Sequence, residues 1–230
     1  MKTIGLLGGM SWESTLIYYQ LINEGVRARL GGLHSAKIVM HSVDFAEIEQ
    51  YQVAGQWAAA GKKLASAALG LEQTGAEMIL ICTNLMHKVA PLIEDEIGVP
   101  LLHIADAVGR SIRKNGLQKV GLLGARYTME EDFYRQRLKD RFDIEVIIPE
   151  EQDRELVHRV IFDELCRGCF TAESRAAYLA VIDRLGNRGA EGVILGCTEI
   201  PLLIKPEHTA LPLFNTAALH AETALEEAFY

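Results

Sequence analysis

The feature that most constrains the fold is a regular alternation of short apolar runs with longer stretches of helical periodicity. Runs such as Met78–Cys82 and Gly192–Leu195 are apolar at consecutive positions, which is typical of strands covered by helices on both faces. Strands that alternate with helices at this spacing predict parallel sheets joined by crossover connections. The predicted strands are Thr3–Leu7, Lys37–Ser42, Met78–Cys82, Leu101–His103, Lys119–Leu123, Glu145–Ile148 and Gly192–Leu195. The predicted helices are Ser14–Leu30, Gln56–Thr74, His87–Glu96, Ala105–Asn115, Glu130–Asp140, Gln152–Cys166, Ala172–Arg188 and Thr216–Phe229.

Parts of the first half of the chain recur in the second half. Ile4-Gly5-Leu6-Leu7-Gly8 returns as Val120-Gly121-Leu122-Leu123-Gly124, 116 positions later. Gly75–Asn84 returns as Gly189–Glu199, 114 to 115 positions later. Because both offsets nearly agree, we expect duplication of a whole α/β lobe. The predicted first lobe comprises residues 1–103 with 209–230, and the second comprises residues 104–208.

The duplication also predicts where a ligand binds. Two similar lobes related by a pseudo-two-fold axis place the ends of equivalent strands opposite each other. Ligands of open parallel sheets bind beyond the carboxyl ends of strands. We therefore expect the loops after residues 7, 82, 123 and 195 to share one cleft, and the active site to lie there.

Composition excludes several classes of protein. The 230 residues have a net charge of −8 and no block of Lys or Arg, which argues against nucleic acid as a partner. No apolar run reaches the roughly 18 residues of a membrane span, and the N-terminus lacks a signal-peptide pattern. Four irregularly spaced cysteines do not form a disulfide framework. We expect a cytoplasmic protein with free thiols.

Two loops carry residues suited to chemistry. Gly8-Gly9-Met10-Ser11 combines a glycine turn with a hydroxyl at a helix start, which suits an anion such as a carboxylate. It has neither the Gly-x-Gly-x-x-Gly pattern of a dinucleotide site nor the Lys of a phosphate loop. Cys197 lies in Gly196-Cys197-Thr198-Glu199, after a strand and before a helix, where a thiol pKa can fall toward neutrality. A buried structural cysteine is the alternative.

The pair Cys166-x-x-Cys169 has the spacing of a redox or metal motif. No second pair and no histidine cluster completes a metal site near it in the sequence. We expect a structural role for these cysteines and no bound metal.

The chain resembles the aspartate/glutamate racemase superfamily over essentially its whole length. The resemblance is carried by Ile4–Met10, by Thr83-Asn84-Leu85-Met86-His87 and by Gly196–Leu203, and its Cys-Thr-Glu form is similar to the aspartate racemase branch. It implies a cofactor-independent racemase of amino acids, typically a homodimer. In such enzymes two thiols face opposite sides of the substrate α-carbon; one removes the α-proton and the other returns a proton.

The chain departs from the family at one of these two thiols. When Asn84 and His87 are aligned with the family's first-lobe motif, Thr83 takes the position of the catalytic cysteine. The internal repeat instead aligns Cys82 with Cys197. Successive side chains at a strand end point to opposite sides, so only one register holds. We favour Thr83 and Cys197 as the catalytic pair. A threonine hydroxyl is a weak acid and a poor base, so Cys197 should serve the L-enantiomer, with slow reaction from the D side.

Substrate carboxylates need hydrogen-bond donors near these two residues. The candidates for substrate binding are Met10, Ser11, Gln52, Asn84, Thr128 and Thr198. Segment Ser42–Gln52 is similar to the family's side-chain recognition loop. Aspartate-specific members carry an Arg there and a Lys in the second lobe; Gln52 and Cys166 stand in their places, which favours a broader substrate range.

Three functions follow from these motifs. The first is a racemase of aspartate, glutamate or a similar amino acid. The second is other superfamily chemistry, such as hydantoin racemisation, maleate isomerisation or malonate decarboxylation. The third is an amino-acid-binding protein that has lost catalysis with its first cysteine.

Overall fold

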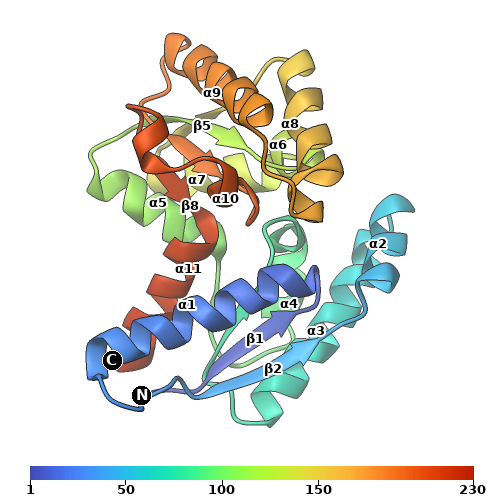
Figure 1. Ribbon diagram of the computed structural model, residues 1–230. Helices are drawn as coiled ribbons and strands as arrows, with labels where there is room; N and C mark the ends of the chain where they lie inside the picture. The colour runs from blue at the N-terminus through green and yellow to red at the C-terminus, as the bar shows by residue number, and fades with distance from the viewer. The chain divides into compact units, whose positions relative to one another are not determined.

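The protein divides into two compact units in a computed structural model that describes residues 1–230 (Figure 1). Unit 1 comprises Met1–Ile104 and Ala217–Tyr230, and unit 2 comprises Ala105–Thr216. Each unit contains one four-stranded parallel sheet flanked by helices, which confirms the predicted fold class.

Unit 1 has the strand order β2-β1-β3-β4. Its strands are β1 (Ile4–Gly8), β2 (Ile38–Ser42), β3 (Met78–Ile81) and β4 (Leu101–Leu102). Its helices are α1 (Trp12–Leu30), α2 (Phe45–Val53), α3 (Trp57–Gln73), η1 (Leu85–Val89), α4 (Ala90–Glu94) and α11 (Thr216–Phe229) from Ala217 onward. All strand pairs are parallel, as consecutive apolar positions predict.

Both faces of the first sheet are buried under helices. Alternate residues Met78 and Leu80 of β3 pack with residues of α1 and α11. The residues between them, Ile79 and Ile81, pack on the opposite face with residues of α3. This two-sided burial accounts for the uninterrupted apolar runs in the sequence.

Unit 2 repeats the arrangement with the strand order β6-β5-β7-β8. Its strands are β5 (Lys119–Leu123), β6 (Glu145–Ile147), β7 (Val193–Leu195) and β8 (Leu213–Asn215). Its helices are α5 (Ile104–Lys114) from Ala105 onward, α6 (Arg126–Glu130), α7 (Asp132–Phe142), α8 (Glu151–Asp163), η2 (Leu165–Arg167), α9 (Ala172–Asn187), α10 (Ile200–Leu203) and η3 (Pro206–His208). In each unit the first strand lies between the second and the third, and the fourth lies beside the third, as expected of a duplicated lobe.

The unit boundaries differ from the predicted lobes near the C-terminus. Residues 209–216 were expected in the first lobe, but β8 pairs with β7 and the segment up to Thr216 lies in unit 2. The Thr216 hydroxyl also donates to the Leu195 carbonyl at 3.1 Å.

Three helical segments also differ from expectation. Residues predicted as a recognition loop form α2, with Asp44 capping its N-terminus through the Ala46 N–H. The helix predicted over Glu130–Asp140 is α7, which begins two residues later because Glu131 has an extended backbone and separates it from the unpredicted α6. The helix predicted over His87–Glu96 is divided into η1 and α4.

No helix of the structure combines the length and the apolar character that a membrane span requires. All four cysteines are free thiols.

Candidate active site

The candidate residues lie where each sheet reverses its strand order. In unit 1 the chain leaves β1 for the strand on one side and returns to β3 on the other, so the switch point lies between β1 and β3. In unit 2 the corresponding point lies between β5 and β7. Such points at the carboxyl edge of a parallel sheet are the usual ligand sites of α/β folds. Seven of the eight predicted site residues lie on or just beyond the loops that follow these strands: Met10, Ser11, Thr83, Asn84, Thr128, Cys197 and Thr198.

The hydrogen bonds of the two sheets show which residues are equivalent. In unit 1 the Cys82 N–H donates to the Leu7 carbonyl at 2.9 Å. In unit 2 the Gly196 N–H donates to the Leu123 carbonyl at 2.7 Å. Leu7 and Leu123 hold the same position in the repeated strands, so Cys82 is the counterpart of Gly196. The sequence repeat had aligned Cys82 with Cys197, and that alignment is one residue out of register.

One residue further along, Thr83 is therefore the counterpart of Cys197. Cys82 is fully buried among apolar side chains of the α1 and α11 face, and this burial raises the pKa of its thiol. Thr83 follows it and is only half-buried. The alternation of side chains at a strand end thus places Cys82 in the core and Thr83 at the carboxyl edge of the sheet.

The Cys197 thiol lies against a carboxylate. Its Sγ is 2.7 Å from Oε2 of Glu199, and the Thr198 hydroxyl donates to the same oxygen at 2.9 Å. Burial raises the pKa of the Cys197 thiol well above its ordinary value, and the charge of Glu199 and its hydrogen bond raise it further. The backbone N–H of Glu199 acts in the opposite direction on this pKa.

The direction of this shift is opposite to the fall in thiol pKa that a position before a helix can produce. Helix α10 has only four residues, Ile200–Leu203, and offers little dipole to stabilise a thiolate. In the free protein Cys197 is a protonated thiol that donates to Glu199. Sequence reasoning used Glu199 only as part of the family motif and missed its role as a partner of the thiol. Its position two residues after Cys197 is the signal that points to it.

The first loop of unit 1 is built as the sequence predicts. The Ser11 side chain caps α1 by accepting the Ser14 N–H at 3.3 Å, and Ser11 is half-buried. The Thr15 hydroxyl donates to the Ser11 carbonyl at 2.9 Å and accepts the Gly9 N–H at 2.9 Å. Gly9 has a φ of +90°, and a Cβ there would lie 2.2 Å from the Val43 carbonyl oxygen. These contacts fix the backbone of the loop.

The side chains of Met10 and Gln52 both contact the buried core cluster on the α3 face of the sheet in unit 1. The Met10 side chain is buried in the core cluster on the α3 face of the sheet, so any contact with a ligand falls to its backbone. The Gln52 amide, on α2, donates to Sδ of Met86 at 3.1 Å. Met86 is fully buried three residues after Thr83. Gln52 is thereby connected to the segment that begins with Thr83 and Asn84.

Thr128 has a packing role in unit 2. It is buried, and a Cβ added at Gly124 would lie 3.3 Å from its Cβ. A Cβ added at Gly196 would lie 3.4 Å from its methyl group. Thr128 therefore fits against the loops that follow β5 and β7, and glycine at these two positions permits the close approach.

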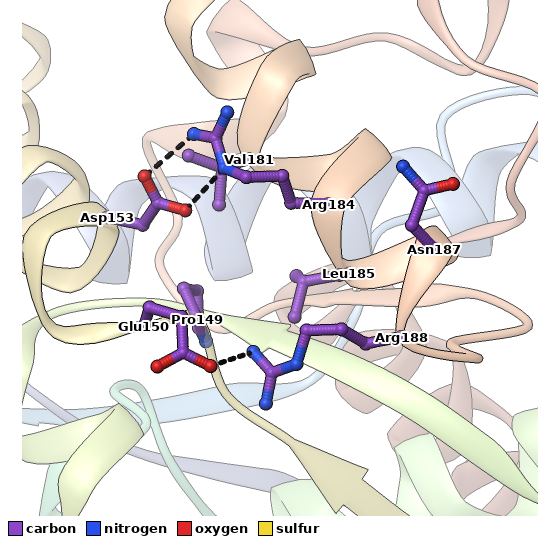
Figure 2. A pocket seen from close by; sticks show the side chains of 8 residues that line it. All are labelled: Pro149, Glu150, Asp153, Val181, Arg184, Leu185, Asn187 and Arg188. Carbon is purple, nitrogen blue, oxygen red and sulfur yellow. Dashed lines mark hydrogen bonds and ion pairs between the residues drawn. The ribbon is translucent and has the colours of Figure 1, made fainter.

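A surface pocket of about 240 Å³ in unit 2 lies elsewhere (Figure 2). Its lining includes two paired arginines: Arg184 binds Asp153 through two hydrogen bonds of 2.7 Å, and Arg188 lies 3.2 Å from Glu150. No residue of the loops after β5 and β7 lines it. Because its charges neutralise each other within the protein, we assign the site to the strand ends and not to this pocket.

The structure contains no group of three or more His, Cys, Asp or Glu side chains arranged to hold a metal ion. Cys166, within η2, and Cys169, just after it, are both exposed.

Comparison with known proteins identifies the family. The sequence profile described as Asp/Glu/Hydantoin racemase matches residues 7–224. A crystal structure of a Yersinia pestis protein assigned to the Asp/Glu racemases is 53% identical, with a TM-score of 0.96 and 100% of both chains covered. An aspartate racemase homologue from Pyrococcus horikoshii is 36% identical, with a TM-score of 0.91 and 100% of both chains covered.

Curated relatives agree over a shorter stretch. A glutamate racemase of Limosilactobacillus reuteri is 27% identical over 142 residues, which cover 61% of this chain and 51% of that protein. The match thus spans about half the length of that relative. Together with the profile match over nearly the whole chain, these similarities show that the chain belongs to the Asp/Glu/hydantoin racemase family.

Proposed function

We propose that the protein is an amino-acid racemase in which Cys197 removes the α-proton of an L-amino acid and Thr83 serves the opposite face of the substrate. The observation that carries the proposal is the equivalence of Thr83 and Cys197 at the carboxyl ends of equivalent strands. A duplicated lobe that presents one reactive group per unit suits a reaction on two faces of one carbon. The family membership and the relatives named as aspartate and glutamate racemases support this reading.

Glu199 gives Cys197 a route to its reactive form. The thiol already donates toward the Glu199 carboxylate, so transfer of that proton produces a thiolate and a neutral carboxyl group. The thiolate then takes the α-proton of the substrate and becomes a thiol again, leaving a carbanion. This order of events accounts for a catalytic cysteine whose pKa is raised in the free protein.

The proton that completes inversion must come from the other face. We propose that the Thr83 hydroxyl donates it or holds a water that does, and that solvent restores it. Because a hydroxyl is a far weaker acid than a thiol, inversion should be slower than removal of the L-side proton. A threonine is also a poor base, so the D-enantiomer should react slowly.

The substrate is proposed to be aspartate, glutamate or a similar amino acid, without PLP or another cofactor. Asn84 and Thr198 directly follow Thr83 and Cys197 in the sequence, and Ser11 lies in the loop after β1, the strand beside β3; all three offer donors for carboxylates. Gln52 replaces a cation in the expected recognition segment, and Cys166 replaces the second, which supports a range broader than acidic side chains. We also propose that the protein forms a homodimer and acts in the cytoplasm.

The test is α-proton exchange in deuterated water over a panel of L- and D-amino acids. We expect deuterium to enter L-substrates faster than D-enantiomers, and Cys197→Ala to abolish the exchange. Thr83→Cys should speed reaction from the D side. Equal turnover of both enantiomers by the wild type would contradict the asymmetry. Binding of amino acids without any exchange would instead support the binding-protein alternative, which the threonine at position 83 favours.

A further inference from the structure

Unit 1 contains three buried histidines that lie in contact around the end of β4. His87 comes from η1, His103 follows β4, and His220 comes from α11. The ring centroids of His87 and His103 are 4.5 Å apart, and those of His87 and His220 are 5.6 Å apart. The three are at most 5% exposed. No part of the proposed chemistry uses them.

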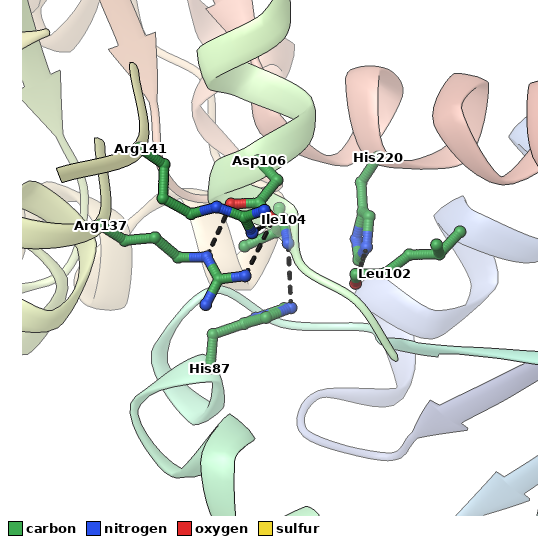
Figure 3. A network of polar contacts seen from close by, with 7 residues as sticks. All are labelled: His87, Leu102, Ile104, Asp106, Arg137, Arg141 and His220. Atoms are coloured by element: carbon green, nitrogen blue, oxygen red, sulfur yellow. Dashed lines mark hydrogen bonds and ion pairs between the residues drawn. The ribbon is translucent and has the colours of Figure 1, made fainter. Parts of the chain in front are cut away.

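The hydrogen bonds of His87 define its protonation state, and Figure 3 shows the one to Ile104. Its Nδ1 is 2.8 Å from the Thr83 carbonyl oxygen, which only accepts, so Nδ1 carries the proton. Its Nε2 is 3.2 Å from the Ile104 backbone nitrogen, whose N–H donates to it. One nitrogen donates and the other accepts, which requires a neutral ring. Burial and the two neighbouring histidines lower the pKa of His87, in agreement with this state.

His220 has the opposite tautomer. Its Nε2 is 2.7 Å from the Leu102 carbonyl oxygen, so this nitrogen carries the proton. Its Nδ1 is 2.9 Å from the Tyr18 hydroxyl, which therefore donates to it. His220 thus bonds to one end of the segment Leu102–Ile104 and His87 bonds to the other. Of these two histidines, His87 also bonds to the Thr83 carbonyl.

We propose that His87 is a positioning residue that fixes the Thr83–Asn84 peptide by donating its Nδ1–H to the Thr83 carbonyl, while the Ile104 N–H holds the ring in the tautomer that can donate. A peptide unit is planar, so a fixed carbonyl fixes the orientation of the whole Thr83–Asn84 peptide. The Thr83 side chain is then attached to a backbone whose orientation is fixed. Small displacements of a reacting group lower rates steeply. The inference rests on the proposed function, because it assigns His87 to the inversion step at Thr83.

The experiment separates inversion from proton removal. With an L-amino acid in deuterated water, chiral chromatography measures the D-product, and mass spectrometry measures deuterium in the remaining L-substrate. His87→Gln keeps an acceptor near the Nε2 position and loses the Nδ1 donor. His87→Asn keeps a donor near the Nδ1 position and loses the acceptor. Tyr18→Phe, which removes the hydroxyl bonded to His220, is the matched control for loss of a buried hydrogen bond.

We expect His87→Gln to lower the ratio of inversion to exchange about ten-fold. His87→Asn and Tyr18→Phe should leave the ratio within about two-fold of wild type, even where they lower the melting temperature. An unchanged ratio in His87→Gln, or an equal fall in all three variants, would overturn the assignment.

A readout independent of activity tests the geometry. Long-range proton–nitrogen spectra of the wild type should show His87 protonated at Nδ1 and His220 protonated at Nε2. The reverse tautomer at His87 would overturn the inference while leaving the racemase proposal intact. A wild type that exchanges no amino acid would overturn the racemase proposal, and the catalytic assignment of His87 with it, whatever the tautomers.

Discussion

Substitution of Cys82 tests whether this thiol is a core residue or a reacting group. Its side chain is fully buried beside Leu80 and Tyr18 and has only a weak contact, 4.0 Å, with the Leu80 carbonyl. Cys82→Ala removes a sulfur atom of roughly methylene size, worth about 0.8 kcal/mol in burial. With the cavity that remains, the loss is about 1–2 kcal/mol. For a chain of this size that lowers the melting temperature by about 2–8 °C.

The activity of the same variant should be nearly unchanged. We expect α-proton exchange from the L side within about three-fold of wild type, because Cys82 lies in the core and burial raises the pKa of its thiol. Thr83→Ala should show the opposite pattern: a melting temperature within about 2 °C of wild type, and inversion reduced at least ten-fold.

Scanning calorimetry and the exchange assay, applied to both variants, measure the two effects. Cys82→Ala that abolishes exchange while leaving the melting temperature unchanged would refute the register argument. In that case Cys82, and not Thr83, would occupy the catalytic position. Alkylation of the native wild type by iodoacetamide, followed by peptide mass mapping, should leave Cys82 unmodified as an internal check.

Three further predictions concern other parts of the site. In Glu199→Gln the loss of the carboxylate charge lowers the pKa of Cys197, so alkylation of this thiol should accelerate at pH 8 while α-proton exchange falls about ten-fold or more; slower alkylation would contradict the assigned pairing. The folded protein holds the pKa of His87 below its unfolded value, so the unfolded state binds more protons below about pH 6.5. The free energy of unfolding should therefore fall as pH drops below about 6.5, by at most about 1.4 kcal/mol per pH unit from this group, and urea titrations of His87→Asn should show a shallower fall. Gly8→Ala should lower the free energy of unfolding by about 1–3 kcal/mol, because the new Cβ would lie 2.4 Å from the Thr15 methyl group. A smaller loss of unfolding free energy in urea titrations would show that Thr15 moves aside at little cost.

The sequence predicted the strands and the larger helices closely. Buried parallel strands such as β3 and β7 need apolar residues at consecutive positions, and this pattern is readable without a structure. Strand β8 was not predicted, and α2 lay in a segment expected to be a loop. Their formation depends on partners distant in the chain, such as β7 for β8.

The duplicated α/β plan and the position of Cys197 at a strand end are readable from the sequence, because apolar runs, glycine turns and a long internal repeat are local or periodic patterns. The sequence left open whether Cys82 or Thr83 corresponds to Cys197, because the alignment based on the apolar strand and the alignment based on the functional loop differ by one residue. The equivalence of Thr83 and Cys197 became visible in the fold, through the hydrogen bonds of Cys82 and Gly196 to the neighbouring strands. The fold also raises the pKa of Cys197, whereas a position before a helix can lower it. That pKa depends on burial and on the distance to Glu199, and both are set by how the chain packs in three dimensions.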